Sequence, residues 1–181
     1  MSGSSSSALL PGQKTEYAVI MLLLAVGIAG IVALSWRAGA ALDPHSLIKP
    51  MLAMFAITLV VWVLIPLSRH WAVLTRRASA KYYLDFQKDP PAEWIERPAR
   101  TYNNLMQAPT LFHVVSLLMI VTPWADHAQL ELAWIFVALR AAHALIYLGA
   151  NHLMLRFASF ALSSFVLWAM WARFALIAPY N

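Results

Sequence analysis

Polar and charged side chains recur at helical spacing inside two otherwise apolar stretches of the chain. The first stripe has spacings of three, four and three residues and consists of Arg97, Arg100, Asn104 and Gln107. The second has spacings of three and four residues and consists of Arg140, His143 and Tyr147. At about 3.6 residues per turn, each stripe falls on one face of a helix. The spacing therefore predicts a polar cleft between two helices and a candidate binding site within it.

Of all the residues in the two stripes, Arg140 has the highest free-energy cost of insertion into a membrane. It lies roughly ten residues from either end of its apolar stretch, which at about 1.5 Å per residue places it near the middle of a membrane. An arginine there costs about 2.5–3.5 kcal/mol on insertion scales. We expect it to turn inward, toward the deep polar side chains Asn104, Gln107, His113 and His143. Such groups can also simply hold a bundle together, which is the structural alternative to a binding site.

The composition indicates that lipid is the solvent of this chain. Of its 181 residues, 61% are hydrophobic and 12% are charged, whereas soluble domains carry about a quarter charged residues. The absence of cysteine excludes disulfides, thiolate metal sites and a protein thiol nucleophile. The histidines form no pair with i,i+4 spacing, so no metal site is expected.

Five apolar stretches are long enough to cross a bilayer. The sequence predicts transmembrane helices at 17–36, 49–71, 100–124, 130–150 and 156–177. The Ser/Gly-rich segment 1–13 is expected to be a disordered lead. Residues 14–48 would form a separate first helix and its loop, and residues 49–181 a four-helix membrane domain. The fold class is therefore an all-α integral membrane protein.

The distribution of positive charge predicts the orientation. Seven of the thirteen basic residues lie between the second and third spans: Arg69, Arg76, Arg77, Lys81, Lys88, Arg97 and Arg100. The positive-inside rule places loop 72–99 in the cytoplasm. A nucleic-acid binder would cluster its basic residues on a soluble face, so nucleic acid is not an expected partner. Within this loop, Asp89 followed by two prolines predicts the start of a short helix that runs into the third span.

The same residues resemble the motifs of the MAPEG family, the membrane-associated proteins in eicosanoid and glutathione metabolism. The first motif reads Glu96, Arg97, Arg100, Asn104 and Pro109, and the second reads Arg140, His143, Tyr147, Leu148, Gly149 and Arg156. The resemblance covers roughly residues 50–177 and leaves the first span outside. It implies a four-helix bundle with one additional N-terminal helix, assembled as a homotrimer, and it suits a bacterial inner membrane.

The resemblance further implies a glutathione site in a cleft between neighbouring subunits, open toward the cytoplasm. Arg100, Asn104, His143 and Tyr147 would hold the glutathione backbone, and Arg97, Gln107 and Arg140 complete the candidate cofactor-binding set. Arg156 would be the catalytic residue, because a cation beside the sulfur raises the thiolate fraction. The implied activity is a glutathione-dependent transferase or peroxidase acting on a lipophilic substrate.

Four positions depart from the family pattern. Gln107 replaces an acid, Asn103 an arginine, Phe157 a serine and Phe160 a tyrosine. These changes keep open a second hypothesis, a non-catalytic scaffold or accessory subunit of a larger membrane complex. A third hypothesis is a lipid or quinone site in the same cleft, whose basic rim would attract headgroups.

Overall fold

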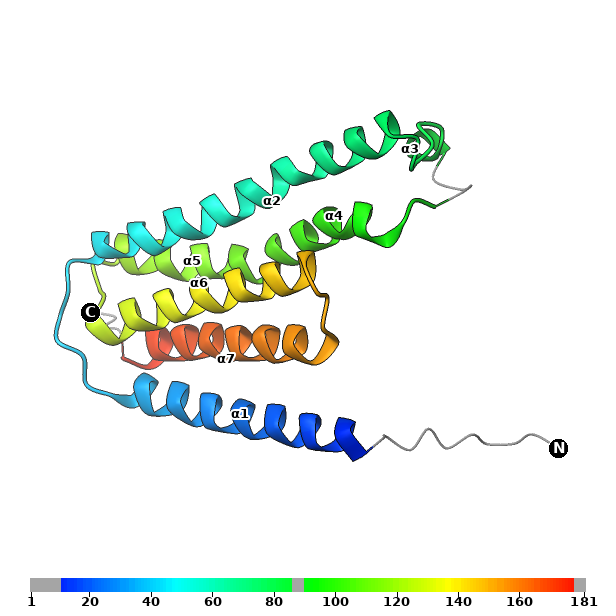
Figure 1. The fold of residues 1–181 in the computed structure, drawn as a ribbon. Coiled ribbons are helices and arrows are strands. Elements are labelled where there is room, and N and C mark those ends of the chain that lie inside the picture. The colour runs from blue at the N-terminus through cyan, green and yellow to red at the C-terminus, as the bar shows by residue number, and fades with distance from the viewer. Residues whose placement is uncertain (1–10, 86–89, 178–181) are drawn as a thin grey trace.

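The computed structural model describes residues 11–85 and 90–177, and within them the chain is all-α (Figure 1). Seven α-helices and one 3-10 helix follow one another in these residues: α1 (Pro11–Trp36), η1 (Pro44–Leu47), α2 (Ile48–Leu74), α3 (Tyr82–Asp85), α4 (Glu93–Leu105), α5 (Ala108–Val121), α6 (His127–Leu148) and α7 (Leu153–Ile177). Five stretches of this described part are long and apolar enough to cross a membrane. The five predicted spans are confirmed.

The boundaries differ from the predictions mainly at the amino terminus. Helix α1 begins at Pro11, so residues 11–13 of the expected disordered lead belong to the helix, while residues 1–10 lie outside the described part. The expected helix start at Asp89 also falls outside it. Helix α4 begins at Glu93, and Glu93 and Glu96 lie in its first turn, where carboxylates stabilise the positive end of the helix dipole.

The third span is not one continuous helix, contrary to the prediction. It consists of α4 and α5, which are separated at Met106 and Gln107, and Gln107 has a non-helical backbone. The cause is Pro109, which has no amide hydrogen and whose ring clashes with the carbonyl of Leu105 in a continuous helix. The helical stripe therefore ends at Asn104, and Gln107 leaves its face.

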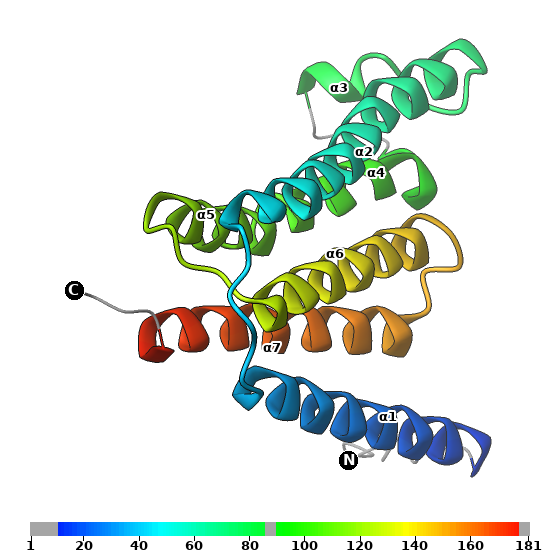
Figure 2. The same ribbon diagram turned by 90° about the vertical axis from the view of Figure 1, so that its left-hand side faces the viewer.

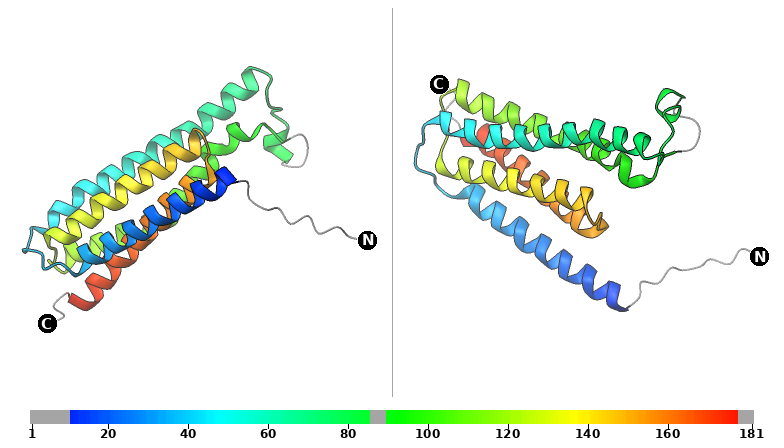
Figure 3. Two further views of the ribbon diagram at one scale, coloured as in Figure 1. Left: turned by 60° about the horizontal axis from the view of Figure 1, so that its bottom comes forward. Right: turned by 45° about the horizontal axis from the view of Figure 1, so that its top comes forward.

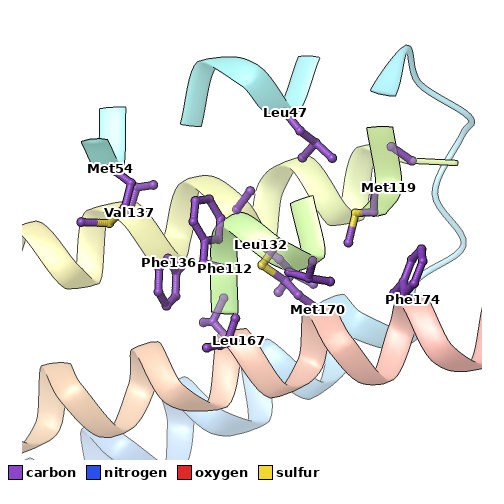
Figure 4. Packing of buried hydrophobic residues seen from close by; sticks show 14 of the residues in the cluster. Leu47, Met54, Phe112, Met119, Leu132, Phe136, Val137, Leu167, Met170 and Phe174 are labelled. Carbon is purple, nitrogen blue, oxygen red and sulfur yellow. The ribbon is translucent and has the colours of Figure 1, made fainter. Parts of the chain in front are cut away.

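Helices α6 and α7 pack side by side, α2 lies along α4, and α1 lies along the outer side of α7 (Figures 2 and 3). The apolar core lies between α2, α5, α6 and α7. Its centre is the stacked ring pair of Phe112 and Phe136, whose centroids are 4.7 Å apart, with Met54 and Met170 close by (Figure 4). Large apolar side chains such as Leu22 and Trp62 are exposed, as expected for helices that face lipid.

The additional helix α1 is tied to the bundle at both ends. Near its start, Glu16 lies 2.8 Å from His152. At its far end, the backbone carbonyl of Ser35 accepts a hydrogen bond from Arg173, and Arg173 also pairs with Asp126. This buried ion pair was not predicted, because Arg173 lies near the end of the predicted span 156–177, where a long side chain can reach the membrane surface.

Candidate functional site

Four of the eight predicted site residues surround one cavity of about 250 Å³. Asn104 comes from α4, His143 and Tyr147 from α6, and Arg156 from α7. The remaining lining residues are apolar: Leu153, Phe157 and Phe160. The cavity lies where α6 ends and α7 begins, at the same end of the bundle as the basic segment after α2 (Figure 1).

The guanidinium group of Arg156 is held in place from two sides. Its Nη1 donates to Oδ1 of Asn151 at 2.6 Å, and its guanidinium carbon lies 4.4 Å from the ring centroid of Tyr147. Asn151 itself has a φ of 50°, a left-handed conformation that asparagine adopts more readily than most residues. Its Nδ2 donates to Glu93 at 3.0 Å, so the turn between α6 and α7 orients the cation of the cavity.

His143 has one ring nitrogen occupied and one without a partner. Its Nδ1 lies 3.0 Å from the carbonyl oxygen of Arg156, and Ser159 donates to the same oxygen at 3.0 Å. Because a carbonyl can only accept, Nδ1 carries the proton, and in neutral His143 Nε2 is left as an acceptor. This Nε2 is buried without a hydrogen-bond partner among the described residues. The Nε2 atom can therefore accept a hydrogen bond from a donor group of a ligand.

Arg140 turns inward, as predicted, and is fully buried. Its Nη2 donates to the backbone carbonyl of Asn104 at 2.9 Å, and the rings of Phe136 and Phe160 lie 5.9 and 5.4 Å from its guanidinium carbon. Helices α4 and α6 thus face each other. The described hydrogen bond is to a backbone carbonyl, because the break before Gln107 leaves acceptors free at the end of α4.

The other predicted residues lie outside the cavity. Arg97 donates to the carbonyl of Gly149 at 2.7 Å and lies 3.7 Å from Glu93, so it ties α4 to the end of α6. Arg100 is exposed, and Asn104 donates to its backbone carbonyl. Gln107 is exposed at the helix break. Arg140 also does not line the cavity.

A second, more apolar cavity of about 520 Å³ adjoins the first. Phe157 and Phe160 line both cavities, so their rings separate a polar compartment from an apolar one. The second cavity also contains Gln107, Leu111 and Trp168. Two of the four departures from the family pattern, Phe157 and Phe160, therefore form the boundary between the compartments.

Two residues that position the site were missed from the sequence. Asn151 orients Arg156, and Ser159 donates to the carbonyl that His143 also contacts. The sequence gives only a weak local signal for Asn151. An asparagine shortly after a helix-ending glycine is typical of a turn with a left-handed residue.

The fold and the cavity define an all-α membrane bundle with a basic and partly aromatic site between its helices. The model of the MAPEG family matches residues 52–176, and the chain belongs to this family. Comparison with curated proteins and with solved structures gives no match. The matched region contains α4, α5 and α6 completely and leaves α1 outside.

Proposed function

We propose that this protein binds glutathione in the cavity lined by Asn104, His143, Tyr147 and Arg156, and acts as a glutathione-dependent transferase or peroxidase. The observation that carries the proposal is the convergence of these four side chains from three helices on one cavity. Bound glutathione would supply a thiolate nucleophile for an electrophilic carbon or a peroxide oxygen of a lipophilic substrate.

The residues of the cavity fit an anionic, hydrogen-bonding ligand. Arg156 provides a guanidinium cation, which can pair with a carboxylate or a thiolate. The unpartnered Nε2 of His143 provides a buried acceptor. Arg100 lies one helical turn before Asn104, where a further cation is available for a carboxylate. Amide and phenol groups of Asn104 and Tyr147 add neutral donors.

Arg156 is the proposed catalytic residue. A guanidinium beside a sulfur favours the anionic form of that sulfur, which is the nucleophilic form. Its bond to Asn151 and its position over Tyr147 reduce its freedom before any ligand enters, and an oriented cation stabilises developing charge without reorganisation. The lipophilic substrate is assigned to the adjoining apolar cavity, beyond Phe157 and Phe160.

The homotrimer belongs to the same proposal. Arg100, Asn103 and Gln107 are exposed along α4 and the break that follows it, and α5, which continues the span, exposes apolar side chains such as Leu111 and Leu117. Exposed polar groups at membrane depth favour a protein neighbour over lipid. The bacterial inner membrane and a cytoplasmic loop 72–99 are proposed on the distribution of basic residues.

The test is equilibrium binding of glutathione to the purified, full-length protein, measured by calorimetry, with ultraviolet absorbance to detect bound thiolate. Arg156→Ala should lower the bound thiolate fraction roughly ten-fold or more, since charge-assisted hydrogen bonds contribute about 1.5–3 kcal/mol. Arg156→Lys should retain part of it. Arg37→Ala, at an exposed cation near the opposite end of the bundle, is the control. Absence of binding at millimolar glutathione would reject the proposal.

A second candidate is a non-catalytic accessory subunit. It is favoured by α1, an added helix with an apolar outer face, in which a Cβ atom added at Gly30 would meet no atom of a neighbouring element within 4 Å. That face could accommodate a helix of a larger membrane protein, since small residues allow close helix approach. A stoichiometric partner in affinity purification, together with no glutathione binding, would select this candidate.

A further inference from the structure

The end of α2 and the segment that follows it enclose two cavities away from the candidate site. The first, of about 470 Å³, is largely apolar and is lined by Ile65, Pro66, Arg69, His70, Val73, Leu74, Ala80 and Tyr83. The second, of about 510 Å³, contains Arg76, Arg77 and Ser79. Val73 and Ala80 line both cavities. An apolar compartment thus adjoins a cationic one.

The position along α2 places these cavities at the membrane surface. Helix α2 has 27 residues and is about 40 Å long at 1.5 Å per residue, whereas the hydrocarbon core of a bilayer is about 30 Å thick. Figure 1 shows the end of α2 extending past α6 and α7. Trp71 and Trp94 meet edge to face there, 5.5 Å apart, and tryptophan favours the interface. The apolar cavity therefore reaches from acyl-chain depth toward the headgroups.

The cations of the second cavity stand on a hydrogen-bonded backbone turn and lack described counter-ions. Arg76 has a φ of 57°, and the turn is closed by the amides of Arg76 and Arg77, which donate to Val73 and Ala72. Among the residues whose side chains the structure describes, 14–83 and 90–176, no carboxylate forms an ion pair with either arginine. Arg69 differs, because Glu96 neutralises it at 2.7 Å.

We propose that this pair of cavities binds one anionic phospholipid, with an acyl chain along the apolar cavity and the phosphate group at Arg76 and Arg77. Both compartments are needed for this assignment. A free phosphate ion would leave the apolar cavity unused, and in a zwitterionic lipid the cation of the headgroup would offset the phosphate charge beside the two arginines. The site shares no residue with the cavity of Arg156, so the proposal is independent of glutathione chemistry.

The experiment uses full-length protein in phosphatidylcholine nanodiscs, titrated with fluorescent phosphatidylglycerol. Anionic lipid should bind more tightly than labelled phosphatidylcholine. Each basic residue near a charged surface contributes about five-fold in affinity, so the double variant Arg76→Gln, Arg77→Gln should bind roughly thirty-fold more weakly. Lys14→Gln removes an exposed cation from α1 at the same end of the bundle and should leave the affinity unchanged.

A second variant tests the apolar compartment without changing charge. Ala80→Trp fills the wall common to both cavities and should weaken lipid binding while α-helical circular dichroism stays the same. Equal affinity for both lipids, or a double arginine variant within two-fold of the parent protein, would overturn the proposal. So would full competition by water-soluble glycerol phosphate, or unchanged binding in Ala80→Trp, because either result would show that the acyl chain is not bound.

Discussion

Replacing Asp126 by asparagine should destabilise the bundle by removing one charge from its most enclosed described ion pair. Asp126 has two separate contacts. Its Oδ1 accepts from the amide of Gln129 at 2.8 Å and caps α6, and its Oδ2 accepts from Arg173. Asparagine caps helices as well as aspartate does, so the substitution keeps the first contact and isolates the loss of charge.

The magnitude follows from the burial of both partners. The side chains of Arg173 and Asp126 are 2% and 9% exposed. Removing one member of a buried pair costs about 3–5 kcal/mol, because the other charge stays buried without compensation. The carbonyl of Ser35 still accepts from Arg173, so the guanidinium keeps one partner although the amide oxygen stays at the cap and the new NH2 group faces Arg173. We therefore expect the lower end of that range, about 3 kcal/mol.

The double variant Asp126→Asn, Arg173→Met removes both charges and should cost about 1 kcal/mol or less, since apolar replacement of a whole buried pair is often neutral. The free energy of unfolding can be measured by helical circular dichroism during titration of micelles with dodecyl sulfate. The double variant should then be about 2 kcal/mol more stable than Asp126→Asn alone, and the single Arg173→Met variant completes the cycle that gives the coupling energy. The single Asp126→Asn variant should also open segment 37–43 to protease, because Arg173 fixes the end of α1.

The reasoning would be refuted by a single-variant cost below about 1 kcal/mol, or by a double variant as unstable as the sum of the two single variants. The first result would mean that water reaches the pair and screens it. The second would mean that the two side chains do not interact, and that Arg173 stabilises the end of α1 through other contacts.

Three further predictions follow from local geometry. Gly27→Val should destabilise the protein by about 1–3 kcal/mol, because a Cβ atom there meets an α7 leucine at 2.7 Å. In contrast, Gly30→Ala should stabilise α1 by up to about 1 kcal/mol, because alanine favours a helix more than glycine does. Chemical unfolding of both variants measures the two changes in the free energy of unfolding. Burial, followed by the charge of nearby Glu96, raises the pKa of Tyr83 above 10.0, so the free energy of unfolding should fall as pH rises past 10, and Tyr83→Phe should remove that part of the decline. Under the proposed function, Asn151→Ala should lower glutathione turnover more than glutathione binding, because Arg156 loses the bond that orients it; steady-state kinetics separates kcat from KM.

The sequence by itself determined those features that follow from the preference of side chains for lipid or for a polar environment. The five spans follow from apolar length, and the inward orientation of Arg140 follows from the cost of placing a guanidinium in hydrocarbon. The two motifs also identified four residues that the structure places around one cavity: Asn104, His143, Tyr147 and Arg156.

The tertiary structure decided which of these groups meet. The polar stripe was assigned at 3.6 residues per turn, which assumes an unbroken helix. Pro109 is evident in the sequence, but the sequence analysis did not predict the helix break before it. This break removes Gln107 from the helix face that carries Asn104. Arg173 and Asp126 are 47 residues apart in the chain, so their pairing depends on α6 and α7 lying side by side. The cost of placing one polar side chain in lipid can be estimated from that residue alone. A contact between two residues on different helices depends on where both side chains lie, and only the packing of the helices determines this.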